Sequence, residues 1–294
     1  MKQSRAVAEL GFASALWGFS FIAAVWAMQS IGFLTLTFVR FFIATIVCAG
    51  FAIAFGAKKD LLDRKQLFLA FWPGMLLALT LVLQTWGLAY TTATKSGFIT
   101  CLYILFVPIL EAWYFKKKIS PWHWLFVLTS LIGTAMIVDL QSGNWNKGDA
   151  ITLLCTFAAS LQIFYFALIS TKIRSSIAFN SLQSMWAFII PGMLMLSFEV
   201  IPAAPFTSLA IAGILAISLG SSSLAFLFQI RAQKVISPTT ASILYLLESP
   251  FAMIFAVALL GERLQLTQWL GVVIVMASVG FAVRLSGNKV NQSA

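Results

Sequence analysis

Ten runs of predominantly apolar residues follow one another along this chain, and only short polar links separate them. A run of about twenty such residues, coiled as a helix, spans the hydrocarbon layer of a membrane. Because the links leave no room for a soluble domain, the sequence predicts an all-α integral membrane protein with ten transmembrane helices. The runs are Leu10–Gln29, Phe33–Phe55, Leu67–Tyr90, Thr94–Phe115, Trp122–Asp139, Ala150–Thr171, Ser181–Ile201, Phe206–Arg231, Ser237–Leu260 and Gln268–Leu285.

The composition agrees with a membrane protein. Hydrophobic residues make up 61% of the chain and charged residues 10%, against about 45–50% and about 25% in soluble domains. The net charge of +10 would suggest a nucleic-acid partner in a soluble chain. Here the basic residues lie in the links, so we expect membrane lipid as the partner and no nucleic acid. The sequence has no zinc-ligand spacing, phosphate-binding glycine loop or nucleophile elbow, so we expect no metal, no cofactor and no enzyme activity.

The basic residues also predict an orientation. With the amino terminus placed in the cytoplasm, 15 of the 19 Lys and Arg residues fall on the cytoplasmic side and three on the outer side. An excess of Lys and Arg in cytoplasmic links is the usual determinant of topology. We therefore expect a multi-pass protein of the cytoplasmic (inner) membrane with both termini in the cytoplasm.

A pattern in the fourth run recurs in the ninth run. The repetition predicts two halves, 1–147 and 148–294, with five spans each. Because five is an odd number, the second half starts on the opposite side of the membrane, which gives inverted repeats around a central cavity. Such halves are typical of carriers that open to one side and then to the other. The matching residues are Leu102, Tyr103, Leu105 and Pro108 and, 142 positions later, Leu244, Tyr245, Leu247 and Pro250.

A carboxylate, Glu248, lies in the middle of the ninth run, two residues before Pro250. An ionisable group at that depth is costly and marks a functional site by default. Proline removes a backbone donor and clashes with the carbonyl four residues earlier, so we expect kinks beside Pro250 and Pro108. We predict that Glu248 binds a cationic group of the substrate or carries a proton that couples transport. The alternative is a structural carboxyl group that ties the ninth span to a neighbouring helix.

Two more charged residues lie within apolar runs. Glu111 is close to the cytoplasmic end of the fourth run, either as a gate that pairs with a lysine or as a half-solvated carboxylate. Arg40 lies well inside the second run, either as a group that binds a carboxylate or as a structural partner of carbonyl groups or a helix end. We class Glu111, Arg40, Pro108 and Pro250 as gating or structural residues.

Polar and aromatic side chains near the middle of the runs complete the predicted substrate site. Amides and hydroxyls there contact a substrate or merely bond other helices, and an aromatic cage beside Glu248 would favour a cationic group. The candidates are Tyr245, Tyr103, Trp17, Gln84, Gln162, Ser221 and Ser222, with Thr80, Ser218 and Gln229 in the same polar set.

Three further features are interpreted as structural. The segment Trp122–Trp124 follows three lysines and is typical of an aromatic belt at the membrane surface, so His123 is not expected to be a ligand. Small residues such as Gly271 and Gly280 either pack helices internally or form the face of a homodimer. The cysteines lie within apolar runs, where we expect them to act as small buried residues; they are Cys48, Cys101 and Cys155.

Short motifs follow one another in a fixed order along the chain. They are Ala15–Gly18, Val39–Phe41, Gly97–Thr100 leading to Pro108, Gly148–Asp149, Glu248–Pro250, Gly261–Leu264 and Gln268–Gly271. Their order and spacing, over nearly the whole chain, resemble the EamA-type transporters of the drug/metabolite transporter superfamily. The resemblance implies a ten-helix carrier with a central cavity, formed mainly by spans one, three, four, six, eight and nine. The first half departs from the pattern, with Lys116–Lys118 where the second half has Gly-Glu-Arg.

These features predict a secondary active transporter that moves a small polar or zwitterionic metabolite, amino-acid-like or cationic, by alternating access. The expected energy source is a proton gradient acting through Glu248 or the gradient of the substrate itself. One alternative is an integral-membrane enzyme acting on a lipid-linked substrate, which would need acidic or histidine clusters at one interface. The other is a structural membrane protein, which needs no polar cavity.

Overall fold

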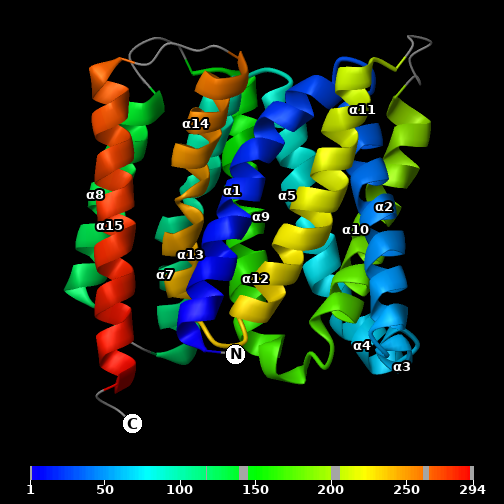
Figure 1. Ribbon diagram of the computed structural model, residues 1–294, viewed down its shortest axis with the longest axis horizontal. Coiled ribbons are helices and arrows are strands. Elements are labelled where there is room, and N and C mark those ends of the chain that lie inside the picture. The colour runs from blue at the N-terminus through cyan, green and yellow to red at the C-terminus, as the bar shows by residue number, and fades with distance from the viewer. Residues whose placement is uncertain (1, 117, 139–144, 200–205, 261–264, 292–294) are drawn as a thin grey trace.

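The computed structural model describes residues 2–116, 118–138, 145–199, 206–260 and 265–291. Every regular element in these ranges is a helix, and the helices run side by side in one bundle (Figure 1). They are α1 (Gln3–Ala27), α2 (Phe33–Ala54), α3 (Lys58–Leu61), α4 (Arg64–Leu69), α5 (Phe71–Leu88), α6 (Ala93–Cys101), α7 (Tyr103–Phe115), α8 (Pro121–Val138), α9 (Lys147–Ile169), η2 (Ser170–Lys172), α10 (Ser176–Phe198), α11 (Ser208–Leu215), η3 (Ala216–Ala225), α12 (Phe226–Ala232), α13 (Pro238–Tyr245), α14 (Glu248–Leu260) and α15 (Leu266–Asn291).

Eight helical stretches in the described ranges are long and apolar enough to cross a membrane. A shorter apolar stretch, Leu266–Ala282, belongs to α15, and α15 packs along α8. The protein is therefore an all-α, multi-pass membrane protein, as predicted. The eight stretches are Gln3–Ala27, Phe33–Ala54, Arg64–Leu88, Lys95–Phe115, Lys147–Lys172, Ser176–Phe198, Ser208–Ala232 and Pro238–Leu259.

The packing of the helices follows the same pattern in the two halves of the chain. In the first half, α1 packs against η3, α12 and α14, and in the second half α9 packs against α5, α6 and α7. At one edge of the bundle α2 lies against α10, and at the other edge α8 lies against α15 (Figure 1). Exchanging the two halves therefore turns the α1 contacts into the α9 contacts and leaves the α2–α10 and α8–α15 contacts unchanged. Both termini lie at the same end of the bundle (Figure 1).

Three spans differ in detail from the apolar runs that predicted them. α1 begins at Gln3, within the polar segment before the first run, where Arg5 and Glu9 form an i,i+4 ion pair at 3.1 Å. The third span starts in α4 and continues in α5 after a break at Ala70. The eighth span consists of α11, the π-helical segment η3 and α12. The hydrophobic periodicity of the sequence did not indicate that the turns of η3 are wider than those of an α-helix.

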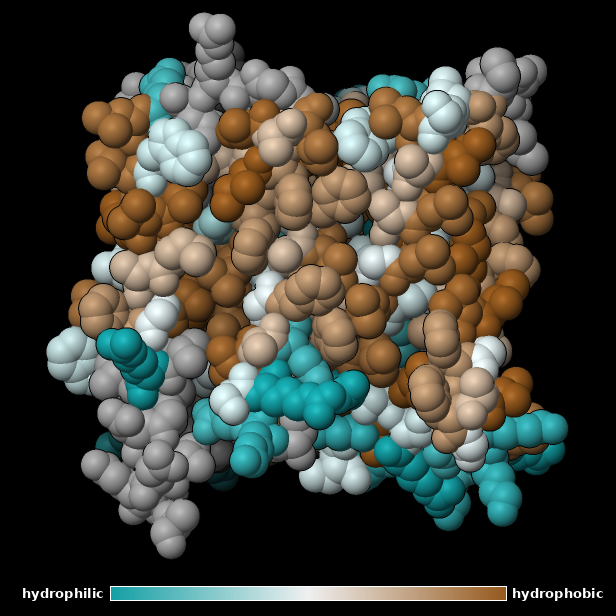
Figure 2. All heavy atoms as spheres, in the orientation of Figure 1, coloured by the Kyte–Doolittle hydropathy of each residue, from teal (hydrophilic) through white to brown (hydrophobic). Residues whose placement is uncertain are grey.

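The surface carries a broad hydrophobic belt, and hydrophilic residues gather at the end of the bundle that holds the termini (Figure 2). Large apolar side chains such as Phe51, Trp113 and Leu196 are exposed. Soluble monomers rarely expose a contiguous apolar surface of this extent. Membrane lipid accounts for the belt, because its hydrocarbon layer covers the middle of a spanning bundle.

The structure confirms that the cysteines are buried and places Gly271 and Gly280 in different surroundings. All three cysteines are buried and free. A Cβ atom on Gly133 of α8 would lie 2.9 Å from the carbonyl oxygen of Gly271, so Gly133 permits the close contact of α8 with α15 at Gly271. Gly280 is exposed, with no atom within 4 Å of a Cβ placed on it.

Gly18 permits the closest contact between α1 and α14. A Cβ atom there would lie 2.7 Å from both the nitrogen of Ala252 and the carbonyl oxygen of Glu248. We expect Gly18→Ala to lower the free energy of unfolding by about 1–3 kcal/mol, because the backbones must separate. Thermal unfolding in detergent measures the effect. Gly50→Ala is the matched control, since no atom lies within 4 Å of its Cβ position, and equal midpoints for the two variants would contradict the prediction.

Candidate functional site

The fourth and ninth spans are both broken in the middle of the bundle, between α6 and α7 and between α13 and α14. At the breaks, the N–H groups of Leu102 and Leu246 donate to carbonyls three residues back, as in a 3₁₀ turn. The second break lies beside Pro250, as predicted, whereas the first lies more than one turn before Pro108. Glu248 is the first residue of α14, where the helix dipole favours a negative charge.

A cavity lies beside the two breaks, and its walls come from both halves of the chain. It has a volume of about 70 Å³. By the same measure of volume, one water molecule needs about 10–15 Å³. The cavity therefore has room for a few water molecules. A metabolite would need a wider conformation of the protein. Eight of the twelve predicted site residues line the cavity: Glu248, Tyr245, Tyr103, Trp17, Gln84, Gln162, Ser221 and Arg40.

Unpartnered polar atoms converge on this cavity. Among the described residues, five side chains that line it each have a buried polar atom without a hydrogen-bond partner. Native proteins leave few buried polar atoms unpaired, and such atoms usually indicate water or a ligand. The five atoms are Trp17 Nε1, Tyr103 Oη, Tyr245 Oη, Gln162 Nε2 and Gln229 Oε1. The centre of the bundle is therefore a polar cavity and not a packed apolar interior.

Glu248 is buried, and in the described part of the chain no donor bonds its carboxylate. The tie to a neighbouring helix that the sequence left open is thus not made in this conformation. Aromatic rings line the same cavity. The centroids of the Trp17 and Tyr245 rings lie 5.1 Å apart in an edge-to-face contact, and those of the Tyr103 and Tyr245 rings lie 6.2 Å apart. Tyr103 and Tyr245 are the repeat-related pair, so the two halves meet at equivalent positions.

Arg40 is buried, like Glu248, and carries the opposite charge. Its Nε donates to Ser222 Oγ and its Nη2 to Ser221 Oγ, both at 2.8 Å. No carboxylate lies within ion-pair distance of Arg40 in the described ranges. The guanidinium also lines the cavity, although the resemblance placed the second span outside it. Arg40 is therefore a buried cation that is held by hydroxyl groups and lacks a protein counter-ion.

The π-helical segment η3 presents the two serines to Arg40. Asn180 of α10 donates to the carbonyl oxygens of Ser222 and Ser223 at 3.3 and 2.8 Å. The backbone N–H of Phe226 also donates to the Ser223 carbonyl, so Asn180 adds a second donor at the end of η3. Sequence analysis missed Asn180. The available signal was an amide next to Ser181, Gln183 and Ser184 in the seventh span.

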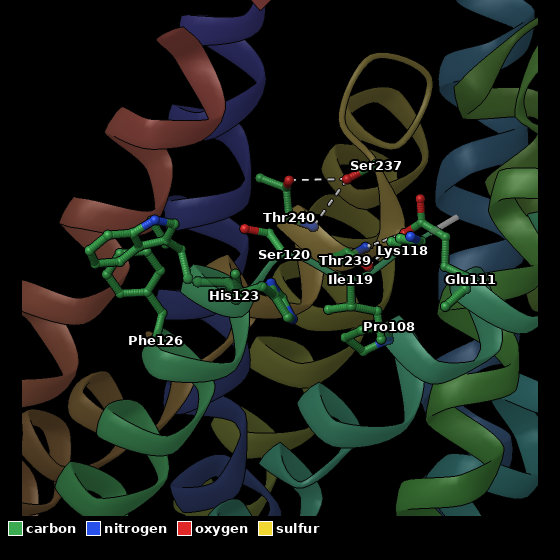
Figure 3. Close-up of a pocket in the computed structure, with 14 residues that line it drawn as sticks. Pro108, Glu111, Lys118, Ile119, Ser120, His123, Phe126, Ser237, Thr239 and Thr240 are labelled. Carbon is green, nitrogen blue, oxygen red and sulfur yellow. Dashed lines mark hydrogen bonds between the residues drawn. The ribbon is translucent and has the colours of Figure 1, made fainter. Parts of the chain in front are cut away.

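Glu111, Pro108 and His123 lie away from the central cavity, around a second cavity (Figure 3). Glu111 does not pair with a lysine in the described ranges; its Oε2 accepts from the N–H and the hydroxyl of Thr239, at 3.1 and 2.6 Å. It thus bonds the first turn of α13. His123 is only 9% exposed, so its assignment to a surface belt was wrong, whereas Trp122 is 62% exposed.

Ion pairs join the two halves at the two ends of the bundle, and sequence analysis missed them. At the end with the termini, Glu9 of α1 pairs with Arg231 of α12 at 2.9 Å. At the other end, Asp149 of α9 pairs with Lys95 of α6 at 2.9 Å and accepts from Thr91 at 2.6 Å. Asp149 lies 140 residues after Glu9, close to the repeat spacing. The available signal was an acid at the start of the first span of each half.

Comparisons with known proteins identify the family. The sequence matches the model of the EamA-like transporter family twice, over residues 8–139 and 146–284. The chain belongs to the EamA-like transporter family. This EamA-like chain therefore contains two family repeats, and its family is one of transporters and not of enzymes, as predicted. The motif Gly261–Leu264 lies outside the described residues.

Relatives of this EamA-like chain match over most of its length. An uncharacterized transporter of Archaeoglobus fulgidus is 28% identical over 279 residues, which cover 94% of this chain and 85% of that protein. The uncharacterized inner membrane transporter YicL of Salmonella typhimurium is 24% identical over 278 residues, covering 91% of each chain. A solved crystal structure superposes with a TM-score of 0.79 at 16% identity, over 98% of this chain and 99% of that one. At that identity the superposition shows a shared fold alone.

Proposed function

We propose that this EamA-like protein is a secondary active transporter that moves a small zwitterionic, amino-acid-like metabolite across the cytoplasmic membrane by alternating access. One observation carries the proposal: a carboxylate and a guanidinium line one buried cavity without pairing with each other. Buried charges in a membrane are costly and are retained for function. A ligand that carries both charges would satisfy both groups at once.

The two charged side chains bind the two oppositely charged groups of the substrate. Glu248, with Tyr103, Tyr245 and Trp17 around it, binds the ammonium group, because aromatic faces also attract cations. Arg40 binds the carboxylate, since its planar guanidinium matches that geometry and its serine bonds hold it in place. Gln84, Gln162 and Gln229 supply polar contacts between them. When the substrate leaves, Glu248 takes up a proton, which couples transport to the proton gradient.

The symmetry of the packing supports two inverted five-helix units, 1–147 and 148–294. We propose that α8 and α15 complete ten spans and that the end with the termini faces the cytoplasm, where hydrophilic residues gather (Figure 2). In this arrangement α1 and α9, the first spans of the two units, run in opposite directions. Inverted units are suited to alternating access, because each can adopt the other's shape. A homodimer would use exposed small residues such as Gly280.

Two of the ion pairs between the repeats act as gates of this mechanism. The Glu9–Arg231 pair holds the cytoplasmic side closed, and the Lys95–Asp149 pair holds the outer side closed. Both pairs are formed together with a cavity too small for a metabolite, as expected for an occluded state. Each half-cycle then breaks one pair and keeps the other.

Breaking one gate is expected to open one side only. We expect Glu9→Gln to raise the labelling of a cysteine introduced at Ser20 by a cytoplasmic thiol reagent by about tenfold, because one lost charge pair shifts the equilibrium by about 1.4 kcal/mol. Asp149→Asn should raise labelling from the outer side instead. Each variant is the control for the other. Equal labelling from both sides in both variants would mean local loosening and would contradict the gating role.

Uptake assays with the purified protein in liposomes test which class of metabolite is transported. We expect uptake of labelled amino acids to be driven by an imposed proton gradient and to be inhibited by other zwitterions. Amines without a carboxylate and carboxylates without an amine should compete weakly. A protein that binds or moves none of these classes would contradict the proposal and favour a structural role.

A further inference from the structure

The second cavity lies between α7, α8, α13 and α15, at the end of the bundle that carries the termini (Figures 1 and 3). Its volume is about 430 Å³, within the range of about 300–1,000 Å³ that holds small ligands. The central cavity shares none of its lining residues. It is therefore separate from the cavity to which the proposed function assigns the substrate.

One side of this cavity is suited to an anion. Lys118 lines it, and the 18-residue helix α8 begins beside it. A lysine ammonium and the positive end of a helix dipole both favour phosphate. His123, in the first turn of α8, is 9% exposed and its Nε2 has no partner in the described ranges. Native proteins leave few buried nitrogen atoms unpaired, so a ligand group that bonds this nitrogen would satisfy it.

The lining of the cavity also carries a negative charge, on Glu111. Both hydrogen bonds that Glu111 accepts in the described ranges end on Oε2, so Oε1 is available to a ligand. The Thr239 hydroxyl donates to Glu111 Oε2, and the Ser237 hydroxyl bonds Thr240 Oγ1 in the first turn of α13 (Figure 3). A ligand that fits the cavity therefore presents an ammonium group to Glu111 and an anionic group to Lys118.

Apolar side chains complete the lining of the cavity. Phe126 and Ile243 line the cavity, and Trp122 at its rim is 62% exposed. The outer face of α8 next to it exposes Leu125 and Leu128, which lipid covers. An amphipathic cavity at the end of a membrane bundle favours a lipid over a freely soluble metabolite.

We propose that this cavity binds the headgroup of a zwitterionic aminophospholipid of the phosphatidylethanolamine type. The phosphate lies between Lys118 and the first turn of α8, with His123 as a further partner. The primary ammonium donates to Glu111, and the glycerol end lies along Ile243 and Phe126. A trimethylammonium headgroup lacks N–H donors for Glu111, so the site distinguishes ethanolamine from choline lipids.

The full-length protein in detergent tests this assignment by thermal unfolding with added lipid. We expect phosphatidylethanolamine to raise the unfolding midpoint by roughly 5 °C more than phosphatidylcholine or phosphatidylglycerol. Glu111→Gln should remove the difference between the ethanolamine and choline lipids. Lys118→Gln, an exposed position, should weaken the binding of both by about tenfold, because each loses a charge-assisted phosphate contact.

Glu199→Gln is the matched control. Glu199 also bonds a helix start, accepting from the N–H groups of Leu34 and Thr35 at 2.7 and 2.8 Å, but it lies outside this cavity. The control should keep the ethanolamine preference, which separates headgroup binding from a lost helix cap. Equal stabilisation by the three lipids, or an unchanged preference in Glu111→Gln, would overturn the proposal. Equal stabilisation by soluble glycerophosphoethanolamine would assign the site to a free metabolite and also overturn it.

Discussion

Glu248→Gln is expected to reduce proton-driven uptake by on the order of 100-fold and to abolish its dependence on pH. Glutamine has nearly the same volume as glutamate but has no negative charge and binds no proton. A substrate ammonium in the cavity would then be buried without a counter-charge, which costs about 2–5 kcal/mol. Uptake of a labelled amino acid into liposomes, measured at several pH values with and without an imposed proton gradient, checks the prediction.

Controls must separate the loss of the Glu248 charge from any loss of folding stability. Glu248 opens α14 and lies beside the contact between Gly18 and Ala252, so the unfolding midpoint of the variant must remain close to that of the native protein. Glu111→Gln removes a carboxylate outside the central cavity and should retain coupling. Normal uptake by Glu248→Gln over the whole pH range would show that Glu248 neither binds the substrate nor carries the coupling proton.

Arg40→Gln is expected to change which charges the protein accepts. Uptake of zwitterions should fall by on the order of 100-fold, because the buried carboxylate of the substrate loses a charge-assisted partner worth several kcal/mol. An amine without a carboxylate should compete as well as before or better, because it no longer shares the cavity with a cation. Competition assays with matched pairs of an amino acid and its decarboxylated amine measure the change directly.

The Arg40→Lys variant distinguishes substrate binding from a structural role. Lysine retains the charge, but its single ammonium does not reproduce the planar donation to Ser221 and Ser222. We expect partial recovery of zwitterion uptake relative to Arg40→Gln. If amines and zwitterions lose uptake equally in both variants and the unfolding midpoints fall together, Arg40 holds η3 in place and does not recognise the substrate.

The position of Arg40 illustrates why sequence patterns did not predict the whole site. Its span was expected to be peripheral, and most of α2 does pack against α10 at the edge of the bundle. Arg40 lines the cavity because η3 places two serine hydroxyls within 2.8 Å of its guanidinium. The wider turns of η3 and the support from Asn180 depend on contacts between residues far apart in the chain, which periodicity within one span does not encode.

The ion pairs at the two ends were missed for a related reason. Glu9 lies just before the first apolar run and Asp149 just before the sixth, where an acid is ordinary in a polar link. Only the folded chain brings Arg231 to Glu9 and Lys95 to Asp149. The same holds for Glu111, whose partner Thr239 lies on a different helix.

The sequence by itself determined the all-α membrane architecture, the repeated halves and most residues of the central cavity. Run length reflects the thickness of the membrane, and a polar residue within a run must face the interior, so both are local properties of the chain. The tertiary structure decided which polar groups share a cavity, which remain unpaired and which charges meet at the ends. Those relations arise where helices cross, and helix crossings depend on packing between residues more than a hundred positions apart.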